Sequence, residues 1–408
     1  MSGAVAGQRW LAILGIGEDG VEGLSAGACA LIRGARLVVG GARHLALADG
    51  LVRGERTVWP SPIADAFPAI LARRGAPVAV LASGDPFCYG VGSALVRLVP
   101  AAEIICLPAP SAFSLAAARL GWALQDVATI SFCGRPLAAL APLLQPGSRI
   151  LALSADAATP AAVATFLRDR GFGPSPLYVL EALGGPRERI RATTADACAL
   201  DSVDPLNLIA IEVVATPDAR VIPLSTGLPD DAFEHEGQLT KREIRAVTLS
   251  ALAPRKGERL WDIGCGSGSV AIEWMLRAPA NRAVAIEARP DRAARAARNA
   301  IALGVPDLEV INGTAPAALA GLPNPDAVFI GGGAQEDGIV ETAWAALRPG
   351  GRIVANAVTI ETEAMLFAAH RRFGGTLTRL GVERLDTIGG SRCFRPAITV
   401  TQWSAVKP

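Results

Sequence analysis

Short apolar runs alternate with amphipathic stretches along the C-terminal half of the chain. The runs have the length of strands, and the stretches repeat apolar residues at helical spacing. We expect strands at 259–263, 283–287, 308–311, 327–330 and 352–355, and helices near 270–276, 290–303, 336–347 and 360–372. This alternation is typical of a mostly parallel sheet covered by helices on both faces. Two last segments, at 376–385 and 397–403, have no helix between them and predict an antiparallel pair at the edge.

The N-terminal half shows the same alternation up to about residue 175. We expect strands at 11–16, 37–39, 78–82, 103–107, 128–132 and 149–153, and helices near 24–33, 90–98, 111–119 and 160–170. Beyond residue 175 the pattern becomes richer in strands, at 177–181 and 206–214. This change predicts two α/β lobes, the second with a more antiparallel sheet.

A segment rich in proline and acidic residues separates the halves. Pro217, Pro223 and Pro229 interrupt any periodic pattern there, so we predict a linker at 217–237 between domains 1–216 and 238–408. After the linker, Thr240 and Glu243 have the spacing of a capping box. They predict a helix that is capped by Thr240 and runs up to Pro254.

Composition narrows the class of protein. Of the 408 residues, 51% are hydrophobic and 19% are charged, which excludes intrinsic disorder. The net charge of +1 and the 5% aromatic content argue against a nucleic-acid partner, and no apolar stretch is long enough to span a membrane. The seven cysteines form no Cys-x-x-Cys pair, and the three histidines lack the spacing of metal ligands. We therefore expect a cytoplasmic protein with free thiols and no metal site.

The clearest chemical signal lies between the first two strands of the C-terminal half. The stretch from Asp262 to Gly268 reads Asp-Ile-Gly-Cys-Gly-Ser-Gly, a tight turn from a strand into a helix. Glycine is needed where φ is positive or where a ligand lies against the backbone, and the helix start favours a negative group. Glu287 follows Gly266 by twenty-one residues and can accept hydrogen bonds from both ribose hydroxyls. Because Ser269 stands at the last glycine position of the dinucleotide pattern, the turn resembles instead the adenosylmethionine loop of class I methyltransferases.

Residues 238–403 also resemble a known family as a whole, the precorrin-6Y C5,15-methyltransferases (decarboxylating) of cobalamin biosynthesis. The resemblance lies in the phrases at 239–243, 262–268, 285–287, 312–316, 329–333 and 347–354. It implies a Rossmann-like class I methyltransferase fold. It also implies that the cofactor is lined by Thr240, Gly264, Cys265, Gly266, Ser267, Gly268, Glu287 and Ala315.

The first half resembles the tetrapyrrole methylase superfamily, over roughly residues 9–215. The matching phrases lie at 15–20, 39–44, 81–86, 89–90, 110–112, 131–135 and 181–184. The resemblance implies a cofactor folded into a cleft between two lobes, near Gly15, Gly17, Ser83, Gly84, Asp85, Ser111 and Ala112. Burying an acid opposite a bound carboxylate would be costly, so we predict that Glu18 points to solvent.

Together the resemblances imply a bifunctional enzyme that binds S-adenosyl-L-methionine at two sites. Precorrin-6Y would receive methyl groups at C5, in the first domain, and at C15, in the second, which would also remove the C12 acetate carboxyl. The product would be precorrin-8X. The chain would associate with copies of itself, by analogy with both families. The anionic tetrapyrrole needs cationic partners, and the candidates by position are Lys241, Arg242, Arg245, Arg384, Arg392 and Arg395. No histidine or acid stands out as a catalytic base.

Two other functions fit the glycine turn. In the first alternative, the chain methylates another acceptor such as RNA. Its binding to RNA would then weaken as the salt concentration rises. Alternatively it binds adenosylmethionine without catalysis, in which case no methyl group reaches purified precorrin-6Y.

Overall fold

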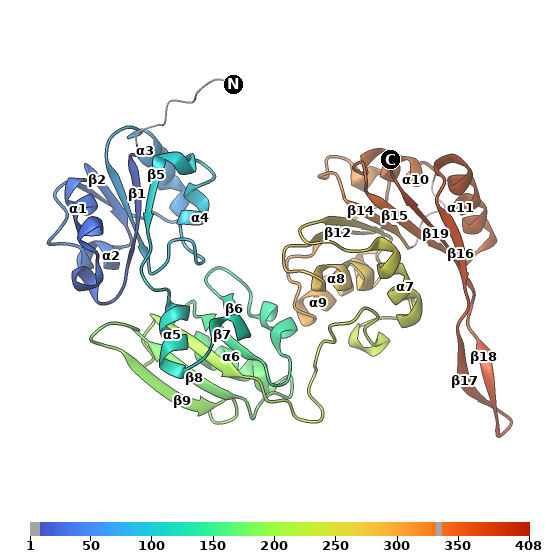
Figure 1. The fold of residues 1–408 in the computed structure, drawn as a ribbon. Helices are drawn as coiled ribbons and strands as arrows, with labels where there is room; N and C mark the ends of the chain where they lie inside the picture. The colour runs from blue at the N-terminus through green and yellow to red at the C-terminus, as the bar shows by residue number, and fades with distance from the viewer. Residues whose placement is uncertain (1–8, 332–336) are drawn as a thin grey trace. The chain divides into compact units, whose positions relative to one another are not determined.

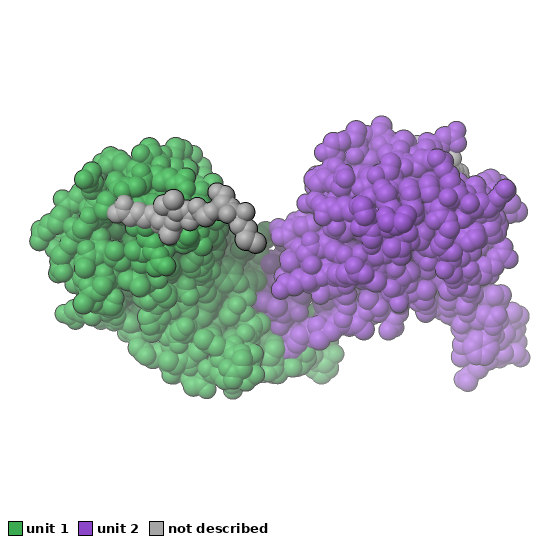
Figure 2. All heavy atoms as spheres, turned by 45° about the horizontal axis from the view of Figure 1, so that its top comes forward, with its two compact units in different colours: residues 1–137, 146–220 green, residues 138–145, 221–408 purple. Residues whose placement is uncertain are grey.

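The computed structural model of the chain describes residues 9–331 and 337–408. The chain forms two compact units, one of residues 1–137 and 146–220 and the other of residues 138–145 and 221–408 (Figure 2). The short segment 138–145 thus packs with the second unit, although it lies within the sequence of the first. Gly332 and Gly333, the end of the phrase at 329–333, lie outside the described residues.

The first lobe of unit 1 is a parallel sheet of five strands in the order β3-β2-β4-β1-β5. Its strands are β1 (Leu11–Ile16), β2 (Leu37–Gly40), β3 (Glu55–Val58), β4 (Val78–Ser83) and β5 (Ile104–Leu107). Its helices are α1 (Ala26–Gly34), α2 (Ala42–Leu47), α3 (Phe67–Leu71) and α4 (Gly92–Leu95). All six residues of β1 are buried, which explains why apolar residues occupy the whole strand. The sequence pattern missed β3 because this edge strand is mostly exposed.

The second lobe of unit 1, which carries the labels β6 to β9 in Figure 1, has the strand order β6-β7-β10-β8-β9. Its strands are β6 (Val127–Ser131), β7 (Arg149–Leu153), β8 (Pro176–Glu181), β9 (Arg189–Thr194) and β10 (Asn207–Glu212). Its helices are α5 (Ala112–Leu120) and α6 (Thr159–Arg168). Only β6 and β7 are parallel, so the prediction of a more antiparallel second sheet is confirmed. The pattern missed β9, whose residues are polar and largely exposed.

Unit 2 is built on a seven-stranded sheet in the order β13-β12-β11-β14-β15-β19-β16. The strands are β11 (Arg259–Ile263), β12 (Arg282–Glu287), β13 (Glu309–Asn312), β14 (Ala327–Ile330), β15 (Arg352–Ala357), β16 (Thr376–Leu380) and β19 (Val400–Val406). The helices are α7 (Arg242–Leu252), α8 (Ser269–Leu276), α9 (Pro290–Ala302), α10 (Ile339–Ala346) and α11 (Ile360–Phe373). Strands β16 and β19 pair antiparallel at the edge, as predicted, and the other five are parallel.

A two-stranded hairpin interrupts the chain between β16 and β19. Strands β17 (Glu383–Ile388) and β18 (Ser391–Pro396) pair with each other and extend away from the seven-stranded sheet (Figure 1). Gly389 and Gly390, both at positive φ, form the turn. The sequence pattern did not predict these as separate strands, because their side chains are mostly exposed and carry no buried face.

The predicted capping box of α7 is wrong. The helix begins one residue later than expected, with Lys241 at the N-cap position and no side-chain hydrogen bond to the cap. Glu243 forms an ion pair with Arg384 instead, so its carboxylate is turned away from the helix start. The helix ends at Leu252, followed by Ala253 in the left-handed region and then Pro254, which cannot continue it.

Candidate active sites

The glycine turn of unit 2 connects the end of β11 to the start of α8. Gly264, Gly266 and Gly268 adopt φ of 70°, 58° and 77°, a region that favours glycine. A Cβ atom built on Gly268 would lie 3.0 Å from the Cβ of Ala296, so this glycine also allows α8 to approach α9. A Cβ built on Gly266 would meet nothing closer than the Gln238 carbonyl oxygen at 3.8 Å. The backbone at Gly266 therefore borders open space.

Glu287 closes this turn from the end of β12. It is only 6% exposed, and one of its carboxylate oxygens accepts a hydrogen bond of 2.9 Å from the Gly266 N–H. The other oxygen accepts a hydrogen bond of 3.0 Å from the backbone N–H of Arg289. Within the described residues no cation forms an ion pair with Glu287. Its carboxylate is thus fixed by backbone donors and retains lone pairs for a ligand.

Asp262 lies directly beneath the turn and is completely buried. Its Oδ2 accepts a hydrogen bond of 3.0 Å from the Ala271 N–H, whereas its Oδ1 has no partner among the described residues. Burial, and in smaller part the nearby Glu287 carboxylate, raise the pKa of Asp262 to about 7. The motif contained this residue, but its environment was not visible in the sequence.

Of the remaining predicted cofactor residues of unit 2, Cys265 and Ser267 belong to the turn itself, whereas Ala315 follows β13 and Thr240 precedes α7. Cys265, Ser267 and Ala315 are buried, and the Ser267 hydroxyl has no partner within the described part of the chain. Thr240 is partly exposed, and its carbonyl accepts a hydrogen bond from the Arg245 guanidinium. The contacts of all these residues with a cofactor stay a prediction.

Arg245 does not fit the expected role in substrate binding. Its side chain and that of Glu273 are both fully buried and form an ion pair of 2.5 Å, and Asp230 lies 3.1 Å away. Glu273 also accepts hydrogen bonds from the backbone N–H groups of Gly227 and Leu228, at 2.7 and 2.9 Å. Arg245 therefore anchors the segment before α7 and is not available to a ligand carboxylate.

The other predicted cations of unit 2 lie at its surface. Lys241 donates a hydrogen bond of 3.1 Å to the Gly237 carbonyl, and Arg242 is exposed. Arg384, Arg392 and Arg395 are exposed on the β17–β18 hairpin. Arg384 pairs with Glu243, and Arg395 pairs with Asp386 at 2.8 Å. The hairpin thus carries three of the six candidates, and Arg384 and Arg395 lie directly opposite each other on its two strands.

Unit 1 contains a cavity of about 400 Å³ whose walls come from both of its lobes. Six of the seven predicted cofactor residues line it, namely Gly17, Ser83, Gly84, Asp85, Ser111 and Ala112. Gly15 supports the wall from behind, because a Cβ atom built there would lie 1.9 Å from the Gly84 carbonyl oxygen. The end of β1 can therefore approach the loop after β4 this closely only because residue 15 is glycine.

A polar cluster that the sequence did not predict borders this cavity. The Arg43 guanidinium donates to the Ser83 hydroxyl at 2.8 Å and to Nε2 of His44 at 2.9 Å. Because a guanidinium only donates, Nε2 accepts and the imidazole is neutral. Burial, together with the charge of Arg43, lowers the pKa of His44 to about 4. His44 and Arg43 were visible only as part of the phrase at 39–44.

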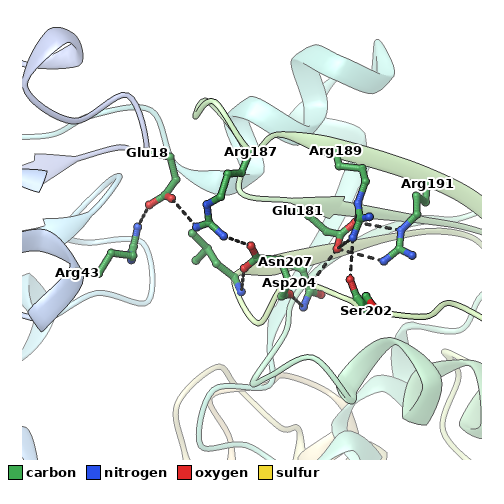
Figure 3. A network of polar contacts seen from close by, with 10 residues as sticks. Glu18, Arg43, Glu181, Arg187, Arg189, Arg191, Ser202, Asp204 and Asn207 are labelled. Carbon is green, nitrogen blue, oxygen red and sulfur yellow. Dashed lines mark hydrogen bonds and ion pairs between the residues drawn. The ribbon is translucent and has the colours of Figure 1, made fainter. Parts of the chain in front are cut away.

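The prediction that Glu18 points to solvent is wrong. Its side chain is 9% exposed and forms ion pairs with Arg43 and, at 3.4 Å, with Arg187 (Figure 3). Arg187 also pairs with Asp204. Two guanidinium groups compensate the buried charge, which removes the cost on which the prediction rested.

A second set of ion pairs lies deeper in the second lobe. Glu181 is 1% exposed and pairs with Arg189 at 2.8 Å and with Arg191 at 3.0 Å (Figure 3). Glu181 also accepts a hydrogen bond of 2.7 Å from the backbone N–H of Asp204, whose side chain pairs with Arg187. These contacts fix the loop that carries Asp204, and they connect it to the cluster around Glu18.

Comparison with known proteins divides the chain in a similar way. A model described as tetrapyrrole (corrin/porphyrin) methylases matches residues 11–199, and a model described as precorrin methyltransferase domain matches residues 231–407. Within the described residues no helix is both long and apolar enough to cross a membrane.

Relatives cover almost the whole chain. A protein of Sinorhizobium sp, named precorrin-6Y C(5,15)-methyltransferase (decarboxylating), is 56% identical over 98% of this chain and 96% of its own. A protein of Mycobacterium tuberculosis with the same name is 43% identical over 97% of this chain and 99% of its own. The solved C-terminal domain of such an enzyme from Rhodobacter capsulatus is 46% identical, covers 46% of this chain and 100% of its own, and has a TM-score of 0.43. With relatives this similar over nearly its full length, the chain belongs to the precorrin-6Y C(5,15)-methyltransferase (decarboxylating) family.

Proposed function

We propose that the chain methylates precorrin-6Y at C5 and C15 and removes the C12 acetate carboxyl as CO2, giving precorrin-8X. Unit 1 performs the C5 methylation, and unit 2 performs the C15 methylation and the decarboxylation. S-adenosyl-L-methionine binds at two sites, one in each unit. The observation that carries this proposal is that one chain has two candidate sites of different construction, the cavity of unit 1 and the glycine turn beside Glu287 in unit 2.

The residues present suit an adenosylmethionine ligand. Glu287 offers a carboxylate to the ribose hydroxyls, and the open backbone at Gly266 leaves room beside it. The Oδ1 of Asp262 and the Ser267 hydroxyl are buried polar atoms without partners in the described chain, and a polar ligand would satisfy them. In unit 1 the loops at Gly17, Gly84 and Ser111 offer backbone groups to a folded ligand.

The main task of the protein in this reaction is to position the reacting carbon next to the methyl group and to exclude water from it. The bound cofactor supplies a methyl group on a sulfonium, which needs no further activation. The walls of the unit 1 cavity include apolar side chains such as Leu81, Phe113 and Leu180, which exclude water from the reacting carbon. Decarboxylation in unit 2 requires an ionised acetate that water solvates weakly and a macrocycle that accepts the electron pair.

A shorter relative supports the division of labour. A protein of Saccharolobus solfataricus, named probable cobalt-precorrin-6B C(15)-methyltransferase (decarboxylating), matches 38% of this chain at 37% identity and 79% of its own length. Its name joins C15 methylation and decarboxylation in a protein that corresponds to less than half of this chain. We assign both activities to unit 2 because residues 238–403 carry the methyltransferase phrases.

Calorimetric titration of the full chain with S-adenosylhomocysteine tests the proposal. We expect two sites per chain. Gly266→Arg, which fills the open space at the turn, removes one site together with C15 methylation and CO2 release. Ser83→Trp, which fills the unit 1 cavity, removes the other site together with C5 methylation. A single site in the wild-type chain, or loss of both sites in either variant, contradicts the proposal.

Single-turnover transfer from labelled adenosylmethionine to precorrin-6Y distinguishes the remaining functions. An enzyme transfers label to the tetrapyrrole, whereas a binding protein leaves the label on the cofactor. Transfer to RNA in preference to precorrin-6Y identifies the alternative acceptor.

A further inference from the structure

Unit 1 has a second hollow, of about 490 Å³, beside the cavity already described. Its lining comes from the segment after β4, through Phe87 and Tyr89 to Arg97, and from Arg135 after β6. Cys88, Tyr89 and Gly90 line both the hollow and the cavity. One short segment thus borders both spaces, so a ligand in the hollow lies next to the predicted methyl donor.

The hollow contains two cations without acidic partners. Arg97 and Arg135 are exposed, and within the described residues neither forms an ion pair. The arginines nearer the cavity differ, since Arg43 and Arg187 are both paired with Glu18. Two unpaired guanidinium groups that face one hollow are suited to bind carboxylates, each through a forked pair of hydrogen bonds.

Tyr89 holds Arg135 in place. The Arg135 guanidinium lies 4.8 Å from the centre of the Tyr89 ring, and the Tyr89 hydroxyl donates a hydrogen bond of 3.2 Å to the Thr129 carbonyl. The ring also packs edge-on against Phe113, which lines the cavity. Tyr89 adopts φ of 55°, a left-handed conformation that costs free energy in any residue except glycine. The strained backbone conformation of Tyr89 places its ring between the hollow and the cavity.

Aromatic surface accompanies these cations. Phe87 is 44% exposed and Tyr89 is 45% exposed, although both are large hydrophobic side chains. Flat apolar rings beside free guanidinium groups are complementary to a conjugated macrocycle with carboxylates on its rim. This combination distinguishes the hollow from an ordinary charged surface.

We infer that Arg97 and Arg135 are substrate-positioning residues of unit 1. Arg97 and Arg135 bind two peripheral carboxylates of the substrate, and Phe87 and Tyr89 contact its ring system, which brings C5 to the mouth of the cavity. The inference rests on the proposed function, because it takes C5 methylation as the reaction of unit 1. It adds the residues that position the substrate there, which lie outside the six cations expected from the sequence.

The test uses the full chain and methyl-labelled adenosylmethionine, with the label at C5 and at C15 resolved by carbon NMR of the product. Arg97→Gln and Arg135→Gln each raise the KM of C5 methylation about tenfold, as expected for one lost charge-assisted contact. The double variant raises it further, and kcat changes less than about threefold. Arg135→Lys restores part of the effect, because it keeps the charge and loses the fork. Arg53→Gln, at an exposed arginine outside the hollow, changes neither constant.

Calorimetry with S-adenosylhomocysteine separates substrate binding from structural damage. The arginine variants retain the wild-type affinity at both cofactor sites. An unchanged KM in the double variant overturns the inference, and so does a parallel loss of cofactor affinity, which would place these residues in the cofactor site. Absence of C5 methylation in the wild-type chain contradicts the proposed function instead, so the two failures are distinguishable.

Discussion

Glu18 forms ion pairs with Arg43 of its own lobe and with Arg187 of the other lobe. Arg187 lies 169 residues after Glu18 in the sequence. The carboxylate is nearly buried at the wall of the unit 1 cavity, whereas Arg187 is 60% exposed. One acidic side chain therefore links both lobes of unit 1 beside the candidate cofactor site. The two guanidinium groups are not equivalent, because only Arg43 also contacts Ser83 and His44.

Removing the two arginines of this cluster should have unequal effects. Arg43→Gln should lower the free energy of unfolding by about 2 kcal/mol, since it breaks two partly buried hydrogen bonds, to Glu18 and His44, and an exposed one to Ser83. Arg187→Gln should lower it by less than about 1 kcal/mol, because its exposed pair is screened by water. Urea unfolding of both variants measures the difference. Equal effects would show that Arg43 has no special role in the cluster.

The low pKa of His44 predicts a specific loss of stability in acid. The folded state keeps His44 neutral down to about pH 4, whereas the unfolded chain protonates it below about 6.5. Stability is therefore complete above pH 6.5 and falls as the pH drops toward 4. Between pH 7.5 and 5 the expected loss is about 2 kcal/mol.

The variant His44→Gln isolates this contribution. Glutamine keeps an acceptor for Arg43 and Ser83 but does not titrate. Urea unfolding at pH 7.5 and at pH 5 should give a smaller change for the variant than for the wild type, by about 2 kcal/mol. Identical pH dependence in both proteins would mean that folding does not lower the pKa of His44.

Gly15 should be intolerant of any side chain. A Cβ atom at this position would overlap the Gly84 carbonyl oxygen, so Gly15→Ala must push the end of β1 away from the loop after β4, which lines the cavity. We expect affinity for S-adenosylhomocysteine in unit 1 to fall about tenfold or more, with the unit 2 site unchanged. Gly34→Ala is the matched control, because nothing lies within 4 Å of its Cβ position at the end of α1. A normal unit 1 site in Gly15→Ala would argue against this loop as part of the site.

The buried pair of Arg245 and Glu273 should be essential to the stability of unit 2. Arg245→Met leaves the Glu273 carboxylate buried without a countercharge, and we expect a loss of about 3–5 kcal/mol. Arg242→Met changes an exposed arginine on the same helix and should cost less than about 0.5 kcal/mol. Thermal unfolding of both variants measures this. If Arg245→Met unfolds like the wild type, the pair is not a structural anchor.

Local pattern predicted much of the fold. The buried strands β1, β4 and β11 are short apolar runs, and each was predicted within one or two residues. The edge strands β3 and β9 and the hairpin of β17 and β18 were missed, because exposed strands carry no hydrophobic signal. The insertion of β19 between β15 and β16 likewise depends on pairing between distant segments.

The sequence by itself determined the glycine turn of unit 2, because the conformation of a tight turn depends on the residues within it. It also determined the number of residues that separate this turn from Glu287. It also determined that the chain has a two-lobed α/β domain followed by a Rossmann-like domain, since the order of the buried strands and helices follows from the hydrophobic pattern. Tertiary structure alone decided which charges are paired. Glu18 is buried against Arg187 and Arg245 against Glu273, while Arg97 and Arg135 face a hollow. The cost of burying a charge depends on neighbours far away in the sequence, so residue type does not reveal whether an arginine anchors the fold or awaits a ligand.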